Sequence, residues 1–293
     1  MRLNSFIEEN SLDFHFKTSA KNWFIPLAHT IADYHAISRQ TFAVGINGCQ
    51  GSGKSTLALF LAETLKQKHN LSVAVLSLDD FYLSQKERLE LAKSIHPLFQ
   101  VRGVPGTHNT LLIKETLLDL KIKGRNVSLP RFNKATDNPS DKKEWPEIKA
   151  PVDIILMEGW CWGVPPQNNK ELNTAINSLE EQQDPQGTWR RNVNDNITLN
   201  YNHLYQQIDF WVMLKAPGFD CVLEWRLQQE EALAKGMKNK SSGTIMSKQD
   251  IENFIPYFQR LTEHALKTMP SRCDLVYHLD HDRNIIKVDD SNR

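Results

Sequence analysis

Short apolar segments and longer amphipathic segments alternate along the chain, and this rhythm is the first guide to its fold. Leu57, Phe60, Leu61 and Leu65 recur at the spacing of a helix that buries one face. The strand candidates are short, almost entirely apolar runs: 41–46, 72–78, 152–157, 210–214 and 275–279. Runs that are apolar on both faces and separated by helices indicate a parallel sheet covered on both sides. The pattern therefore predicts an α/β fold with a doubly wound, mostly parallel, five-stranded sheet and helices on both faces.

We interpret residues 1–293 as a single domain in which helical additions interrupt the strand–helix rhythm. Residues 1–40 are predicted to form an N-terminal helical extension. An insertion at 84–150 contains two amphipathic helices on either side of a glycine-proline turn, and a second, polar insertion at 164–205 is rich in Asn and Gln. Polar insertions that follow strands are where α/β enzymes usually carry their substrate specificity.

Composition and charge exclude several classes of function. The 293 residues are 40% apolar and 24% charged, which is typical of a folded protein, and 35 Lys and Arg balance 35 Asp and Glu. A net charge of zero gives no field that favours nucleic acid or an anionic membrane, and the apolar runs are too short to cross a bilayer. The first ten residues lack the apolar region of a secretion signal, and the four cysteines are widely spaced. We therefore expect a cytoplasmic protein with reduced thiols rather than a disulfide framework or a structural zinc site.

Residues 48–55 match the phosphate-binding pattern G-x-x-x-x-G-K-[ST] in full, after a predicted strand and before a predicted helix. Glycines let such a loop turn successive N–H groups toward phosphate oxygens, and the following helix adds the positive end of its dipole. Lys54 would bridge the β- and γ-phosphates, and Ser55 would ligate Mg²⁺. The motif predicts a P-loop NTPase fold that binds ATP and Mg²⁺ through Gly48, Cys49, Gln50, Gly51, Ser52, Gly53, Lys54, Ser55 and Thr56.

Acidic residues follow two of the predicted strands. Glu158 would lie beside the phosphate loop and hold Mg²⁺, although a helix cap or an ion pair would suit it too. Asp79 is our candidate base, which accepts the proton of a substrate hydroxyl as that oxygen attacks the γ-phosphorus. Because neighbouring side chains diverge, Asp80 is expected to support Asp79 or to cap a helix. The alternative is that both aspartates merely begin the next helix.

A base at this position favours a kinase over a signalling GTPase. GTPases read guanine through an N-K-x-D motif, and the pairs Asn133-Lys134 and Asn239-Lys240 lack the Asp at the required distance. The sequence therefore indicates phosphoryl transfer to a small molecule.

Several motifs resemble the uridine kinase, phosphoribulokinase and pantothenate kinase class of P-loop kinases, and within it the plant-type D-glycerate 3-kinase family with its fungal and bacterial relatives. The similarity runs over about residues 41–287 and is strongest before residue 162. The motifs that carry it are Ser77 to Tyr82, Arg102 to His108, Leu129 to Lys134, Glu158-Gly159-Trp160 and Glu224 to Glu230. This resemblance implies ATP-dependent phosphorylation of a primary hydroxyl of D-glycerate, giving 3-phosphoglycerate.

The resemblance implies that the acceptor binds near residues of the first insertion, 84–150. The Arg and Lys side chains there suit an anionic acceptor, because an Arg side chain can bind a carboxylate bidentately. The segment 222–245, with Arg226 and nearby lysines, is similar to a lid that closes over the phosphates and brings a cation to the transition state. For His108 the alternative is that its hydrogen bonds are satisfied by neighbouring residues, and for the lid an ordinary basic surface helix. Candidate acceptor residues are Asp80, Tyr82, Arg102, His108, Arg131 and Lys134.

Our leading hypothesis is a kinase that uses Mg²⁺ and ATP, with Asp79, Lys54 and Arg226 as catalytic residues and Ser55 and Glu158 at the metal. The expected partner is a small, anionic acceptor such as D-glycerate, with no nucleic acid and no membrane, in a monomer or small homo-oligomer. The same chemistry on a nucleoside or a pantothenate-like acid is an alternative. So is a non-catalytic, ATP-dependent binding module that uses the insertion 164–205 as its interaction surface.

Overall fold

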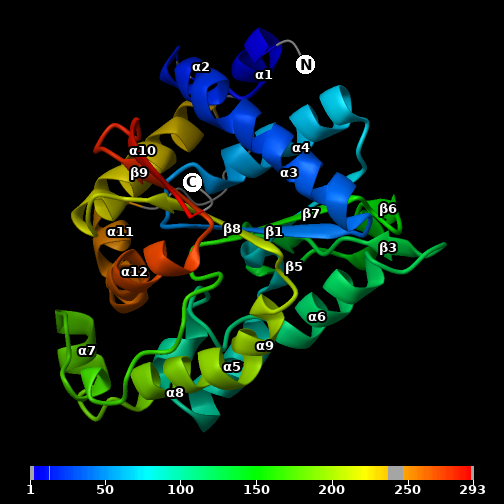
Figure 1. The fold of residues 1–293 in the computed structure, drawn as a ribbon. Helices are drawn as coiled ribbons and strands as arrows, with labels where there is room; N and C mark the ends of the chain where they lie inside the picture. Colours follow the sequence, from blue (N-terminus) through cyan, green and yellow to red (C-terminus); the bar gives the residue numbers. More distant parts are fainter. Residues whose placement is uncertain (1–2, 13, 237–246, 292–293) are drawn as a thin grey trace.

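The computed structural model describes residues 3–12, 14–236 and 247–291, and these form an α/β fold around one main sheet (Figure 1). The strand order is β10-β9-β8-β1-β7-β2. The central strand β1 (Phe42–Gly48) pairs in parallel with β7 (Ile154–Gly159) and β8 (Phe210–Lys215). The strands β2 (Val73–Ser77) and β9 (Leu275–Leu279) extend this parallel arrangement outward. The doubly wound, mostly parallel sheet predicted from the apolar pattern is confirmed.

The sheet has six strands rather than five, because β10 (Ile285–Asp290) adds an antiparallel edge strand beside β9. All of its residues are half-buried or exposed, whereas every residue of β1 and β7 is buried. A strand at the edge of a sheet with one open side lacks the continuous apolar run of a central strand. The apolar pattern of the sequence therefore did not predict β10.

Alternate residues of the central strands belong to two separate hydrophobic clusters, one on each face of the sheet. Val44 and Leu156 pack on one face with α3 (Ile25–Ser38) and α4 (Lys54–His69). Ala43 and Ile155 pack on the other face, with α6 (Thr110–Asp119) and α12 (Pro256–Thr268). Figure 1 shows the two helical layers on opposite sides of the sheet.

The N-terminal segment is helical and packs on the first of these faces. It comprises α1 (Leu3–Glu9), α2 (Phe14–Ser19), a π-helical turn η1 (Ala20–Phe24) and α3, with Pro26 in the first turn of α3 as its missing N–H requires. Phe6 and Phe24 contact Phe60 of α4, with ring centroids 5.3 and 6.2 Å apart. These aromatic contacts hold the segment against the helix that follows the phosphate loop.

The segment between β2 and β7 forms a small subdomain at the carboxyl end of β2. It contains η2 (Leu78–Phe81), α5 (Gln85–Ser94), η3 (Pro97–Gln100), α6 and η4 (Lys142–Glu144). Two short antiparallel pairs lie between α6 and β7: β3 (Asn126–Ser128) with β6 (Glu147–Lys149), and β4 (Phe132–Asn133) with β5 (Asn138–Pro139). The N-cap of α6 is Asn109, whose Oδ1 accepts from the Leu112 N–H at 3.0 Å.

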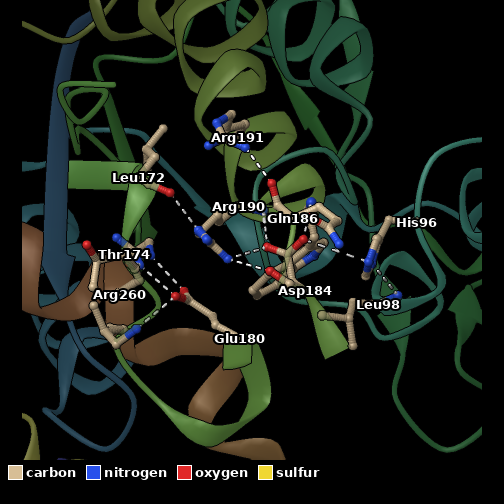
Figure 2. A network of polar contacts seen from close by, with 12 residues as sticks. His96, Leu98, Leu172, Thr174, Glu180, Asp184, Gln186, Arg190, Arg191 and Arg260 are labelled. Atoms are coloured by element: carbon tan, nitrogen blue, oxygen red, sulfur yellow. Dashed lines mark hydrogen bonds and ion pairs between the residues drawn. The ribbon is translucent and has the colours of Figure 1, made fainter. Parts of the chain in front are cut away.

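The polar insertion is held by buried ion pairs (Figure 2). It contains η5 (Glu171–Asn173), α7 (Ser178–Gln183), α8 (Thr188–Asn196), the π-helical turn η6 (Ile197–Tyr201) and α9 (Asn202–Tyr205). Arg260 of α12 donates from Nε and Nη2 to the two carboxylate oxygens of Glu180, both at 2.6 Å. Arg190 pairs with Asp184 at 3.1 Å, and all four side chains are buried. The charges of these four residues are therefore satisfied within the fold.

The remaining helices are α10 (Asp220–Gly236), α11 (Lys248–Phe254) and the short η7 (Pro270–Arg272). Residues 237–245 of the lid-like segment 222–245, which include Lys238 and Lys240, lie outside the described residues. In the described part of the chain, no helix combines the length and the apolar character that crossing a membrane requires.

Candidate active site

The phosphate loop connects β1 to α4, as its motif predicts, and two of its glycines adopt left-handed conformations. Gly51 has φ 77° and Gly53 has φ 93°, in the region that side chains other than glycine avoid. A Cβ at Gly51 would also lie 2.6 Å from Cβ of Trp225 on α10. The first turns of α10, which carry Arg226, therefore pass directly against the loop.

The two predicted metal ligands meet at the start of α4. Ser55 Oγ donates to Glu158 Oε1 at 2.8 Å, and Lys54 Nζ lies 3.9 Å from Glu158 Oε2. The parallel register pairs Ile46 of β1 with Glu158 of β7, so the strand delivers this carboxylate to the loop. Glu158 is a buried acid that supports the loop, and the helix-cap alternative is wrong for it.

The residues present at this point fit a magnesium ion. Glu158 Oε2 and Ser52 Oγ are buried and have no hydrogen-bond partner among the described residues. Glu158 and Ser55 Oγ are hard oxygen donors in contact with each other beside the phosphate loop, which is the environment that Mg²⁺ prefers. Gln50 Oε1 is buried and unpartnered as well, whereas burial raises the pKa of Cys49 to about 12 and keeps that thiol neutral.

Asp79 follows β2, in the turn η2, and makes two side-chain contacts. Lys134 Nζ donates to Asp79 Oδ2 at 2.8 Å, and the Tyr82 hydroxyl donates to Oδ1 at 2.9 Å. Burial alone would raise the pKa of Asp79, but the charges of Lys134 and Lys54 and these hydrogen bonds outweigh it and hold the pKa well below its usual range. Asp79 is therefore a carboxylate at neutral pH, within the electrostatic reach of the phosphate-loop lysine.

Asp80 points to a different set of partners, as the divergence of neighbouring side chains predicts. Its Oδ1 accepts from the Phe132 N–H at 3.2 Å, and Oδ2 lies 3.4 Å from Arg131 Nη1. Burial raises the pKa of Asp80, and Arg131 opposes that rise. Asp80 thus anchors the loop that carries Lys134 to Asp79, which is the supporting role expected of it.

Arg102 forms an ion pair with Asp137, a residue that no motif in the sequence marked as part of the site. Its Nη1 pairs with Asp137 Oδ1, while the buried Arg88 donates from Nη2 to Asp137 Oδ2 at 2.6 Å. The Arg102 guanidinium also lies 5.6 Å from the centroid of the Phe132 ring. The charge of Arg102 is therefore partly neutralised inside the subdomain, and Arg102 braces the same loop as Asp80.

His108 is a neutral, buried histidine, so it offers no positive charge to an anionic acceptor. Only 4% of the residue is exposed, and burial lowers its pKa to about 3 against the opposing charge of Asp79. The ring stacks on Tyr82 with centroids 4.6 Å apart, and its Nδ1 lies 2.6 Å from the Tyr201 hydroxyl. The Tyr201 oxygen also accepts from the Gly106 N–H at 3.3 Å. The His108 Nε2 is buried and has no hydrogen-bond partner among the described residues.

Tyr201 is a member of the site that sequence reasoning missed. It lies in the insertion 164–205, is fully buried, and orients His108 from 93 residues away. A tyrosine in a segment rich in Asn and Gln carries no local signal of such a role. The insertion thus contributes a buried residue that positions His108, which lies within the electrostatic reach of Asp79.

Lys54, Ser55, Glu158 and Asp79 therefore form one centre at the carboxyl ends of β1, β7 and β2, which is the edge where open α/β sheets bind ligands. The centre can hold a triphosphate at the loop, with a carboxylate beside its terminal phosphate. Tyr82 and Lys134 contact that carboxylate, His108 stacks on Tyr82, and Arg131 pairs with the neighbouring Asp80. This arrangement suits transfer of a phosphoryl group to a hydroxyl.

Comparisons with known proteins place this geometry among kinases. No protein-family model matches the chain. An uncharacterized kinase of Schizosaccharomyces pombe, mug58, is 34% identical over 248 residues, which cover 81% of this chain and 85% of that protein. The chloroplastic D-glycerate 3-kinase of Arabidopsis thaliana is 28% identical over an alignment of 309 positions, which covers 96% of this chain but 63% of the plant protein. The solved structure of D-glycerate 3-kinase from Cryptococcus neoformans superposes with a TM-score of 0.74 at 24% identity, over 90% of this chain and 97% of that structure.

Proposed function

Because this chain belongs to the glycerate 3-kinase-like family of P-loop kinases, which is related to the uridine kinases, we propose that it transfers the γ-phosphoryl group of ATP to a hydroxyl of a small anionic acceptor. D-glycerate is the acceptor that we propose, with 3-phosphoglycerate as the product. The observation that carries this proposal is the Asp79 carboxylate, which is held ionised between Lys134 and the phosphate-loop lysine. Two relatives whose names include D-glycerate 3-kinase support the choice of acceptor.

The proposed reaction follows from the positions of these side chains. The acceptor hydroxyl gives its proton to Asp79 while its oxygen forms a bond to the γ-phosphorus. The bond between that phosphorus and the oxygen bridging to the β-phosphate breaks, and ADP leaves. Lys54 neutralises charge on the transferred group, and the fixed N–H groups of the loop hold the remaining phosphates in place.

Ser55 and Glu158 would hold magnesium, which when bound withdraws charge from the β- and γ-phosphates. The ion pair of Glu158 with Lys54 also keeps the lysine pointed along the loop before the nucleotide arrives. Arg226, on the helix that passes against Gly51, is our proposed additional cation for the transferred group.

The acceptor side offers groups that suit a small hydroxy acid. Lys134 is largely exposed and carries a positive charge next to the base, where an acceptor carboxylate is attracted. His108 presents a buried Nε2 with no hydrogen-bond partner among the described residues, which suits a polar group of the acceptor. Arg131 borders the same loop and is half-exposed.

The test is ADP release by the purified protein with Mg²⁺ and ATP, with and without D-glycerate, together with detection of 3-phosphoglycerate. We expect glycerate-dependent release that Asp79→Asn lowers by about 10²–10⁴-fold, the usual contribution of a positioned base. Asp80→Asn is the matched comparison, because it removes a neighbouring charge but leaves Asp79 in place, and its effect on kcat should be smaller.

The outcomes separate the parts of the proposal. Stimulation by a nucleoside or another hydroxy acid, but not by D-glycerate, would overturn the acceptor and leave the kinase proposal intact. ATP binding without stimulation by any acceptor would favour the ATP-dependent binding module instead. Equal losses in Asp79→Asn and Asp80→Asn would contradict Asp79 as the base.

A further inference from the structure

A cavity of about 600 Å³ opens beside the phosphate loop, and neither Asp79 nor Lys134 lines it. Residues 51–56 of the loop and of the start of α4 form one wall. The cavity therefore begins where the phosphates bind and leads away from the acceptor side of the site. Its volume is within the range of small-molecule sites in proteins, about 300–1,000 Å³.

The second wall comes from the N-terminal extension, to which the sequence analysis assigned no chemistry. Leu12, His15 and Phe16 line the cavity, with Asn10 and Ser11 at its polar rim. This segment is fixed from behind, because Phe16 contacts Phe60 of α4 with ring centroids 5.5 Å apart.

The extension is also attached to the main sheet. The Tyr277 hydroxyl of β9 donates to the backbone oxygen of Trp23 at 3.2 Å, and the Tyr277 ring lies 5.8 Å from the ring of Phe24. The N-terminal extension therefore packs on α4, which follows the phosphate loop, and on β9, which lies next to the edge strand β10.

The third wall is the turn between β9 and β10, which is tied to the phosphate loop itself. Arg283 donates from Nε to the Gly51 backbone oxygen at 2.8 Å, and its guanidinium lies 5.0 Å from the centroid of the Trp225 ring. Leu279 and Ile285 add apolar surface on the same side. These three segments, together with Leu214 of β8 and with Trp225 and Gln228 of α10, enclose one space next to the phosphate loop.

The lining has the chemistry of a nucleotide base and its ribose. A purine offers two flat apolar faces and a polar edge, so it needs apolar side chains across its plane and hydrogen-bonding groups at its rim. Leu12, Phe16 and Leu279 supply the apolar surface, and Asn10 and His15 supply polar groups. Since the phosphates are fixed at the loop, the base can only lie in a space that is continuous with it.

We propose that Asn10, Ser11, Leu12, His15 and Phe16 form the wall that holds the base of ATP. The N-terminal extension then sets the affinity and the base preference of the nucleotide site. The phosphate loop binds the phosphates whichever base the nucleotide carries. This inference rests on the proposed use of ATP, but not on the identity of the acceptor.

The first test compares ADP with tripolyphosphate, which has phosphates but no base, by calorimetry on the full chain with Mg²⁺. A charge placed in the apolar wall by Leu12→Asp should weaken ADP binding about tenfold or more and leave tripolyphosphate within about twofold. Leu3→Asp is the matched control, because Leu3 packs against the same core but does not line the cavity. His15→Ala changes an exposed residue, so it tests the wall even if Leu12→Asp fails to fold.

The second test uses the unaltered protein. Photolabelling with 8-azido-ADP, competed by excess ADP, should attach to the tryptic peptide of residues 3–17, which contains the whole proposed wall. Labelling confined to other peptides, or equal losses of ADP and tripolyphosphate affinity in the wall variants, would overturn the inference. A wild-type protein that binds tripolyphosphate but not ADP would overturn it too, while a protein that binds neither would overturn the proposed function as well.

Discussion

The ammonium group of Lys134 lies 2.8 Å from Oδ2 of Asp79, although the two residues come from different segments 55 positions apart. Asp79 is fixed by the end of β2, and Lys134 is delivered by a loop that Asp80 and Arg131 hold in place. In the proposed reaction Asp79 therefore accepts the proton. Asp80 holds in place the loop whose Lys134 lowers the pKa of Asp79. The pair explains why two adjacent acids at one strand end have different tasks.

The contact between Lys134 and Asp79 predicts a pH dependence. A base acts when it is deprotonated, so activity is lost as pH falls through its pKa, and in the wild type that pKa is held well below the usual value of about 3.9. Lys134→Met removes the main opposing charge, and burial then moves the pKa of Asp79 upward. The acidic limb of kcat/KM against pH should shift to higher pH in this variant.

The control for this shift is Lys142→Met. Lys142 belongs to the same subdomain, but its ammonium group lies over the Trp145 ring, 5.8 Å from the centroid, and not beside Asp79. Its pH profile should follow the wild type. Superimposable profiles for Lys134→Met and the wild type would refute the electrostatic role of Lys134.

His108 is predicted to stay neutral across the physiological range, because burial lowers its pKa to about 3. The unfolded chain, with a histidine pKa of about 6.5, binds more protons between these two values, so His108 makes the fold less stable as pH falls from about 6.5 toward 3. The measurement is a histidine ring NMR titration with assignment by His108→Phe. One histidine signal should not move between pH 5 and 8 and should vanish in the variant, whereas a midpoint near 6.5 would contradict the buried, neutral state.

The sequence predicted the site residues that a local motif or the end of a strand places. It did not predict the contacts between residues that are far apart in the sequence. The phosphate loop, Glu158 and Asp79 follow apolar strands, so local pattern and strand topology were enough to bring them together. Asp137 and Tyr201 lie in polar stretches, and their partners Arg102 and His108 are 35 and 93 residues away. Nothing in the local pattern encodes these pairings, so the sequence could name Arg102 and His108 as candidate acceptor residues but not show that one is paired and the other is neutral.

The buried pair of Arg260 and Glu180 is predicted to matter for stability. Arg260→Met leaves the Glu180 carboxylate, which is 1% exposed, without its bidentate partner, and removal of one member of a buried pair costs about 3–5 kcal/mol. The double variant Arg260→Met with Glu180→Met should recover much of that loss. Lys248→Met, which breaks a surface pair with Glu252, should cost less than about 1 kcal/mol. Urea unfolding measures all three, and additive losses in the double variant would contradict the coupling.

The contact between Ser55 and Glu158 predicts a specific dependence on magnesium. Both oxygens face the phosphate loop, 2.8 Å apart, and Glu158 Oε2 has no hydrogen-bond partner among the described residues. In the wild type, removal of Mg²⁺ with EDTA should weaken ATP binding by about tenfold or more, since 1.4 kcal/mol of lost interaction corresponds to that factor. Glu158→Gln keeps the shape and the hydrogen bond from Ser55 but loses the negative charge that attracts the cation.

The variant should therefore bind ATP in EDTA about as tightly as the wild type, and adding Mg²⁺ should improve its affinity much less. Glu147→Gln is a suitable control, because Glu147 lies on the short strand β6, away from the phosphate loop, and should retain the full magnesium effect. Calorimetric titration of ATP with and without Mg²⁺ gives each affinity directly. A magnesium effect of the same size in Glu158→Gln and the wild type would show that the cation is held by other groups.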